Sequence, residues 1–165
     1  MAKDSSFDVV SQVDLQEVDN AVQQASKELI QRFDLKDTHS TITLDKHEAT
    51  ITITAPGDFV FKQVRDVLDS KLVRRSIELK AITWGKIEAA SGDSVRVTGT
   101  IVNGIDQEIA RKINKDVRDQ KYKVKVQIEG DKVRVFSASR DELQAVITFL
   151  KAADYGIPLQ FNNYR

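Results

Sequence analysis

Hydrophobic and polar residues alternate along this chain with two different periods, which predict helices and strands. Apolar residues recur at three- and four-residue spacing up to Phe33, after a predicted N-cap at Asp14 with Glu17 three positions later. The positions expected to face inward on this first helix are Val18, Ala21, Val22, Ala25, Leu29, Ile30 and Phe33. The same spacing predicts three more helices, over about 60–72, 105–120 and 140–154. Ser139 and Glu142 form a second predicted capping box at the start of the last helix.

Segments with a period of two lie between and beside these helices. They predict strands at residues 6–13, 41–44, 49–54, 80–90, 94–102, 122–128, 132–135 and 158–163. Each half of the chain therefore reads β-α-β-β-α-β, which is the order of a ferredoxin-like α+β domain. In that arrangement two helices cover one face of a four-stranded antiparallel sheet and leave the other face open.

A glycine near the middle of the chain determines how the two predicted domains are connected. Only three residues, with Gly92 at their centre, separate the strands at 80–90 and 94–102, and glycine permits the tight reversal of an antiparallel hairpin. Such a hairpin places the second half's opening strand in the first sheet and leaves residues 6–13 to pair with the C-terminal strand. The sequence therefore favours interleaved domains over two sequential domains divided near Gly92. The interleaved domains are 14–103 and 1–13 together with 104–165.

The composition is that of a globular protein without disulfides. Hydrophobic residues make up 41% of the 165 residues and charged residues 30%, which is enough apolar material for a core. The absence of cysteine excludes disulfide bonds, a thiolate nucleophile and sulfur-ligated zinc. No apolar run is long enough for a signal peptide or a membrane span, so we expect a cytoplasmic protein.

A cluster of cations is predicted on the open face of the second sheet. Because the formal net charge is zero, any attraction to a polyanion must come from such local clustering. The outward positions of the hairpin at 121–135 hold Lys121, Lys123, Lys125, Lys132 and Arg134, side chains that suit phosphate groups. Solubility and edge protection are the alternative role for these cations. Phosphate binding is favoured because threonines, and not cations, occupy the equivalent face of the first sheet: Thr41, Thr43, Thr50, Thr52 and Thr54.

Aromatic residues near the chain ends are candidates for stacking on a nucleobase. The strand exchange brings Phe7, Phe161 and Tyr164 to neighbouring strands, although core packing is the favoured role for Phe7 and Phe161. Arg165 follows Tyr164 and two asparagines, and this group of side chains could bind a guanine edge and a phosphate. The aromatic run typical of RNA-recognition motifs is absent from both predicted hairpins.

The remaining polar residues favour structural roles over catalytic ones. Lys71, Arg74 and Arg75 lie at the predicted end of the second helix, where cations complement the helix dipole. The two histidines, His39 and His47, lack the spacing of a metal site. Phosphate-loop, dinucleotide-binding and nucleophile-elbow motifs are also missing from the sequence. We therefore expect a protein without catalytic activity, cofactor or metal.

Several segments resemble the YajQ family of bacterial cytosolic proteins, described as nucleotide-binding and in some members as cyclic di-GMP effectors or RNA binders. The resembling segments are Ser6–Glu17, Arg32–Asp34, Lys71–Arg75, Gly104–Asp106, Val126–Val135, Arg140–Ile147 and Pro158–Arg165. One departure is visible, because the loop that usually carries a Gly-Lys-Lys-like run here reads Phe136-Ser-Ala-Ser139. Two positive charges are therefore absent from that loop.

The resemblance implies a regulatory nucleotide-binding protein whose ligand is cyclic di-GMP, GTP or an RNA such as tRNA. The residues themselves predict a phosphate-binding surface formed by Lys121, Lys123, Lys125, Lys132, Arg134 and Arg165. The alternative is a protein-interaction module that docks a partner such as a transcription factor on its open sheet. Binding measured at increasing salt concentration distinguishes the two, because phosphate contacts weaken steeply with salt.

Overall fold

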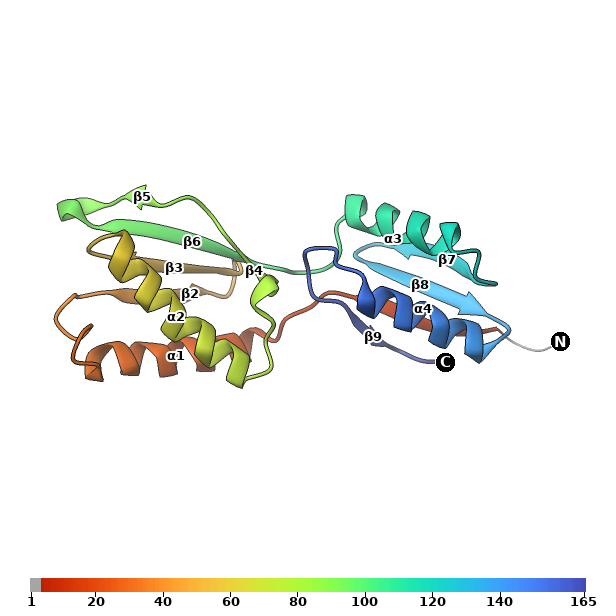
Figure 1. Cartoon of the computed structure of the whole chain (residues 1–165), viewed down its shortest axis with the longest axis horizontal. Helices are drawn as coiled ribbons and strands as arrows, with labels where there is room; N and C mark the ends of the chain where they lie inside the picture. Colours follow the sequence, from red (N-terminus) through yellow and green to blue (C-terminus); the bar gives the residue numbers. More distant parts are fainter. Residues whose placement is uncertain (1–3) are drawn as a thin grey trace. The chain divides into compact units, whose positions relative to one another are not determined.

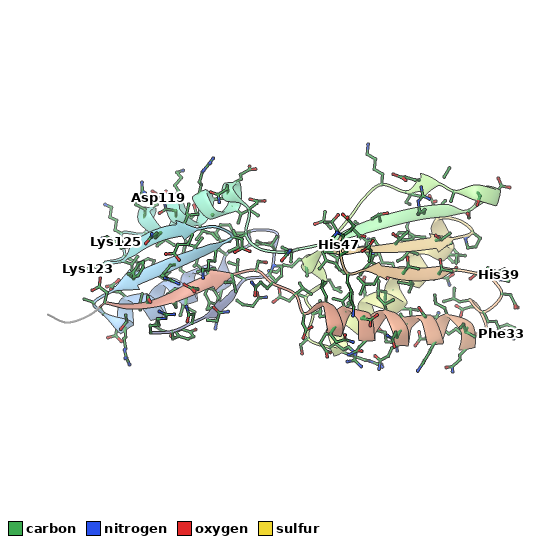
Figure 2. All side chains as sticks on the ribbon, turned by 180° about the vertical axis from the view of Figure 1, so that it is seen from behind. Phe33, His39, His47, Asp119, Lys123 and Lys125 are labelled. Carbon is green, nitrogen blue, oxygen red and sulfur yellow. The ribbon has the colours of Figure 1, made fainter. Side chains whose placement is uncertain are left out.

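The computed structural model of the chain describes residues 4–165, which form two compact units. One unit contains residues 4–12 and Asn103–Arg165, and the other contains Val13–Val102. Each unit has an antiparallel sheet with two α-helices on one face (Figures 1 and 2). The predicted α+β class is therefore confirmed.

The unit Val13–Val102 is built on α1 (Leu15–Gln31) and α2 (Asp58–Arg74). Its sheet has the order β2-β3-β6-β4, with β5 also paired to β6. The strands are β2 (Thr41–Asp45), β3 (Thr50–Ala55), β4 (Ile82–Trp84), β5 (Glu88–Ala89) and β6 (Val95–Ile101). Its core is mostly aliphatic, with Ile51, Ile53, Leu68 and Leu72 among the fully buried side chains.

The unit that contains the two chain ends is built on α3 (Gln107–Asp119) and α4 (Arg140–Ala152). Its sheet has the order β7-β8-β1-β9. The strands are β1 (Ser5–Val10), β7 (Lys125–Glu129), β8 (Lys132–Ser137) and β9 (Gln160–Asn162). Phe7 and Val9 of β1 are fully buried beneath the helices, so the N-terminal strand is part of this core.

α1 and α4 begin at their predicted N-cap residues, but the acid three positions after each cap bonds to another segment and does not complete a capping box. Asp14 accepts a hydrogen bond from the backbone N–H of Gln16, and Ser139 accepts one from the N–H of Glu142. The carboxylate of Glu17 pairs with Arg75, and that of Glu142 accepts from the backbone N–H of Lys123. Each acid therefore joins its helix to another segment of the same unit.

Two residues assigned to the buried stripe of α1 lie in solvent, so that part of the prediction was wrong. Ile30 is 74% exposed and Phe33 is 88% exposed. Successive helical positions are about 100° apart, so Leu29 takes the inward position and Ile30 points away. Phe33 lies in the turn beyond the last helical residue, Gln31, after Arg32, whose extended backbone ends the helix.

The hairpin centred on Gly92 is present, but its first strand is interrupted. Gly92 has φ +67°, in the region that favours glycine. Trp84 pairs with Gly99, whereas Glu88 pairs with Arg96, so three residues on one strand face two on the other. This extra residue forms a bulge that divides the predicted strand 80–90 into β4 and β5.

The strand pairing favours the interleaved division of the chain, which we propose over a sequential one. β1 lies between β8 and β9, with Val9 opposite both Val133 and Phe161. β6 lies between β3 and β4, so it takes the central position that an opening strand has in this fold. Residues 14–103 would then form one domain, and 1–13 with 104–165 the other.

Candidate functional site

The open sheet face of the unit that contains the chain ends carries most of the predicted site residues (Figure 2). The strand register places Lys125, Phe136 and Ser6 opposite one another on β7, β8 and β1. Arg165 continues this row, because its backbone exchanges hydrogen bonds of 3.0 and 3.1 Å with Ser6. Directly opposite residues share a face of the sheet, so the row joins a lysine, a phenylalanine and an arginine.

The three lysines that precede or open β7 are exposed. Lys123 and Lys125 lie at the β7 edge (Figure 2), and Lys121 has φ +60° in the turn before the strand. None of their ammonium groups forms an ion pair with any residue from 4 to 165. These lysines are therefore available to an anionic ligand.

The loop that departs from the family pattern fixes the backbone of Lys123. Ser137 donates a hydrogen bond of 2.8 Å from its hydroxyl to the carbonyl of Lys123, and accepts one from the N–H of Ser139. The carboxylate of Glu142 accepts from the N–H of Lys123 at 3.2 Å. Lys123 is thus held by hydrogen bonds although it lies outside the strand.

The other two predicted cations, Lys132 and Arg134, are partly compensated by acids. Arg134 Nε donates to the carboxylate of Asp8 at 2.8 Å, and a second guanidinium nitrogen lies 3.4 Å from Glu129. Lys132 Nζ lies 3.7 Å from the same Asp8 carboxylate. The sequence analysis did not predict this network. The available signal was Asp8 itself, a charged residue between the apolar residues Phe7 and Val9 of a predicted strand. These two cations therefore contribute less to an anion site than the three lysines.

Asp8 stays ionised although it is only 3% exposed. Burial raises its pKa, but hydrogen bonds from the side chains of Arg134 and Asn163, together with the charges of Arg134 and Lys132, outweigh burial. The net result is a pKa of Asp8 below its ordinary value. The Asp8 hydrogen bonds in turn raise the pKa of Arg134.

The aromatic residues separate into buried and accessible ones. Phe7 is fully buried and meets Phe161 edge to face, with ring centroids 6.0 Å apart, so core packing, the favoured role for Phe7, is confirmed. Phe161 is half-buried against the same core. Tyr164 is 64% exposed. Phe136 was not predicted as a candidate for base stacking. Its two-residue spacing from Arg134 and Lys132 could have shown that it shares their open face.

A small pocket lies where the C-terminal segment meets α4, with a volume of about 300 Å³. Its lining combines hydroxyls, two arginines, an amide, an aliphatic floor and an aromatic ring. The residues are Ser5, Ser6, Arg140, Leu143, Gln144, Ile147, Tyr164 and Arg165. Ser6 and Arg165 also belong to the row, so the pocket lies at the same edge of the sheet, on the side of α4.

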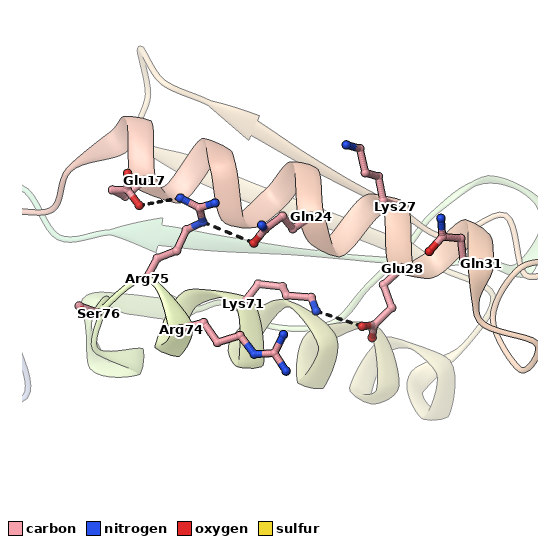
Figure 3. A pocket seen from close by; sticks show the side chains of 9 residues that line it. All are labelled: Glu17, Gln24, Lys27, Glu28, Gln31, Lys71, Arg74, Arg75 and Ser76. Atoms are coloured by element: carbon pink, nitrogen blue, oxygen red, sulfur yellow. Dashed lines mark hydrogen bonds and ion pairs between the residues drawn. The ribbon is translucent and has the colours of Figure 1, made fainter.

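The cations at the end of α2 line a groove against α1 (Figure 3). Lys71 pairs with Glu28 at 3.0 Å and Arg75 with Glu17 at 2.9 Å. The sequence assigned Lys71, Arg74 and Arg75 only to the helix dipole, because it could not show that α1 lies alongside.

Two further findings concern metal sites and membrane spans. Within residues 4–165, histidines, cysteines and acids do not gather in any group of three that could hold a metal ion. His47 is exposed and lies 4.0 Å from Glu48, and His39 occupies a turn with φ +56°. Among the helices described, none has the length and apolar character needed to cross a bilayer.

Comparison with known proteins gives matches over the whole length of the chain. A family model described as "Nucleotide-binding protein YajQ-like" matches residues 5–165. A protein of Alkaliphilus oremlandii named "Nucleotide-binding protein" is 50% identical over 165 residues, which cover all of both chains. Proteins with the same name from Desulfitobacterium hafniense and Bacillus cereus are 49% and 48% identical, again over the full length of both chains.

Proposed function

The chain belongs to the family of YajQ-like nucleotide-binding proteins, and from this premise we propose that it binds a nucleotide on the open sheet face bearing Lys123 and Lys125. The observation that carries the proposal is the row of Lys125, Phe136, Ser6 and Arg165 across four adjacent chain segments. It offers cations for phosphates and an aromatic ring for a base.

The length of this row favours a ligand larger than one nucleotide. Neighbouring strands lie about 4.8 Å apart, so Lys125 and Arg165 are separated by three spacings, about 14 Å. A stretch of single-stranded RNA, such as a tRNA end or loop, can place phosphates at both ends of the row and a base on Phe136. We therefore propose RNA as the ligand of the sheet face, in a regulatory role without catalysis.

A compact guanine nucleotide, cyclic di-GMP or GTP, is the second candidate because of the pocket beside α4. Its volume of about 300 Å³ lies at the lower end of the range for small-molecule sites. Tyr164 can cover a base, while Arg140 and Arg165 can hold phosphate oxygens. This ligand would use Arg165 but leave Lys123 and Lys125 unoccupied.

The remaining alternative is a docking surface for a protein partner such as a transcription factor. The threonine-rich open face of the other sheet favours it, because Thr41, Thr43 and Thr52 present an uncharged, partly exposed surface. Binding through such a face should change little with salt, whereas phosphate binding should weaken steeply.

Calorimetric titration of the protein with tRNA, cyclic di-GMP and GTP tests these proposals. We expect Lys123→Glu combined with Lys125→Glu to abolish tRNA binding, because two attractive charges become repulsive. The matched control is Lys112→Glu with Lys115→Glu, two exposed lysines on α3 of the same unit. Unchanged tRNA affinity in the first variant, with both variants folded, would contradict the proposed surface.

A further inference from the structure

The groove between α1 and α2 is lined by side chains from both helices (Figure 3). Its volume is about 670 Å³, and it lies in the unit Val13–Val102. Four cations are among its lining residues: Lys27 from α1, and Lys71, Arg74 and Arg75 from the end of α2. The proposed nucleotide surface belongs to the other unit, so this groove is a separate candidate for ligand binding.

Two of the four cations are fixed by carboxylates of α1. Lys71 Nζ lies 3.0 Å from Glu28, and Arg75 Nη1 lies 2.9 Å from Glu17. Figure 3 shows both side chains reaching from the α2 side across to α1. Arg75 also donates to the side-chain oxygen of Gln24 at 3.4 Å. These contacts preorganise two donors on one wall of the groove, which lowers the entropic cost of binding.

The other two cations, Lys27 and Arg74, carry charge that no acid compensates. Neither has an ion pair or a side-chain hydrogen bond within the part of the chain described, residues 4–165. Arg74 lies along α2 in Figure 3, whereas Lys27 is turned away from α2. The Lys27 side chain is flexible, so rotation about its stem can carry the ammonium group towards a ligand in the groove. The four cations and two carboxylates leave an excess of two positive charges.

The helix dipole explains only part of this arrangement. Lys71 and Arg74 are in the last turn of α2, where cations are favourable. However, two of the terminal carbonyls of α2 already have partners, because Ser76 N–H donates to Val73 and Ile77 N–H to Leu72, both at 3.0 Å. Lys27 comes from the other helix, four residues before its last residue, and the dipole of α2 gives no reason for its presence.

We propose that the α1–α2 groove binds a compact anion with two linked phosphate groups, such as pyrophosphate or the diphosphate part of a nucleotide. A ligand with at least two negative charges suits the two uncompensated charges of Lys27 and Arg74. The guanidiniums of Arg74 and Arg75 and the amides of Gln24 and Gln31 supply the directed donors that phosphate oxygens accept. All nine lining residues are polar, so the groove offers no aromatic or aliphatic residue to a nucleobase, and the phosphates are the part of the ligand that it recognises.

Isothermal titration of the full chain with pyrophosphate, GDP and guanosine tests this site. The variant Lys27→Gln with Arg74→Gln removes the two uncompensated charges while keeping both ion pairs. The control, Lys62→Gln with Lys112→Gln, removes two exposed lysines that do not line the groove. Lys123→Glu with Lys125→Glu, in the other unit, separates this site from the proposed nucleotide surface.

We expect pyrophosphate to bind the wild-type chain and to lose about tenfold in affinity for each groove cation removed, because each charged hydrogen bond contributes roughly that factor. The Lys62/Lys112 and Lys123/Lys125 variants should bind pyrophosphate as the wild type does, and guanosine should not bind the groove. Equal affinities for pyrophosphate and GDP point to a free phosphate ligand, and tighter GDP binding that still requires Lys27 and Arg74 points to a nucleotide. Absence of pyrophosphate binding, or equal affinity in the groove variant, overturns the proposal.

Discussion

Asp8 on β1 and Arg134 on β8 are joined across the sheet by a hydrogen bond of 2.8 Å between a carboxylate oxygen and Nε. Asn163 donates to the other Asp8 oxygen at 2.9 Å, so the N-terminal strand, β8 and the C-terminal segment meet at this carboxylate. The network links these three segments through side chains and also partly compensates the charges of Lys132 and Arg134 on the open face. It therefore links the stability of the unit to the charge that the face presents.

Replacing Asp8 with Asn should destabilise the protein at neutral pH by about 2 kcal/mol, because Arg134 loses a charged partner and a nearly buried site loses its acceptor. The folded-state pKa of Asp8 lies below its ordinary value of 3.8, so its stabilising effect is present above that pH and is lost as pH falls through the folded value. Urea unfolding of wild type and Asp8→Asn should therefore differ at pH 7, and the difference should shrink as the pH falls through the lowered pKa of Asp8. The exposed Asp119 serves as control, since Asp119→Asn should change stability by about 0.5 kcal/mol or less. A difference between wild type and Asp8→Asn that persists at low pH would contradict this account.

The salt dependence of tRNA binding should distinguish the unpaired lysines, Lys123 and Lys125, from Lys132, which lies near an acid. For single-stranded nucleic acid, each neutralised phosphate contributes about 0.7 to the slope of log affinity against log salt. Lys123→Gln with Lys125→Gln should therefore reduce the slope by about 1.4. Lys132→Gln should reduce it by less than a single free lysine does, because Lys132 already faces Asp8 at 3.7 Å. Equal effects per lysine would show that the acid does not compensate Lys132.

Phe136 should contribute to RNA binding but little to folding. Stacking of a base on an aromatic side chain is worth about 1–3 kcal/mol, so Phe136→Leu should weaken tRNA binding by about tenfold. Phe7→Leu is the matched control, because Phe7 is fully buried and packs against Phe161. We expect that control to lower the melting temperature without a specific loss of affinity. The opposite pattern, with Phe136→Leu affecting only the melting temperature, would remove Phe136 from the binding surface.

The order of helices and strands could be predicted from hydrophobic periodicity, because each element buries one face and therefore repeats apolar residues with its own period. Val18, Ala25 and Leu29 are buried as the pattern of α1 predicts. The pattern failed at the ends of elements, where one residue changes the outcome. Ile30 and Phe33 satisfy the spacing but lie in solvent, because Leu29 is already inward and the helix ends at Gln31.

The charges of the candidate site could be read from the sequence, but their pairing could not. Alternation placed Lys123, Lys125 and Arg134 in one hairpin. Their compensation depends on Asp8, which is 126 residues away from Arg134 in the chain. Likewise, the groove beside Lys71 depends on the packing of α1 against α2, and no local pattern encodes such long-range contacts.

Gly99 in the centre of β6 should not tolerate a side chain. A Cβ atom added there would lie 2.7 Å from Ile82 Cγ2 and 2.9 Å from a ring carbon of Trp84. Gly99→Ala must therefore displace two side chains of β4, which should cost about 1–3 kcal/mol and lower the melting temperature. Gly57→Ala provides the comparison, because nothing lies within 4 Å of a Cβ added at that position, and it should cost about 0.5 kcal/mol or less. Similar losses in both variants would refute the crowding at Gly99.

Fragments of the chain test the interleaved domains directly. Residues 13–102 alone should unfold cooperatively, since their helices, sheet and core are complete. Residues 103–165 alone should not, because they lack β1, the central strand that buries Phe7 and Val9.

Folding of the second fragment should return when residues 4–12 are joined behind Arg165 through a short Asn-Gly turn. Ser6 and Arg165 already exchange two backbone hydrogen bonds, so this fusion extends an antiparallel pairing that exists in the chain. Circular dichroism during heating, with amide dispersion in NMR spectra, measures folding of each fragment. The sequential alternative predicts instead that residues 93–165 fold without β1. A cooperative transition in that fragment, or in 103–165 alone, would therefore refute the strand exchange.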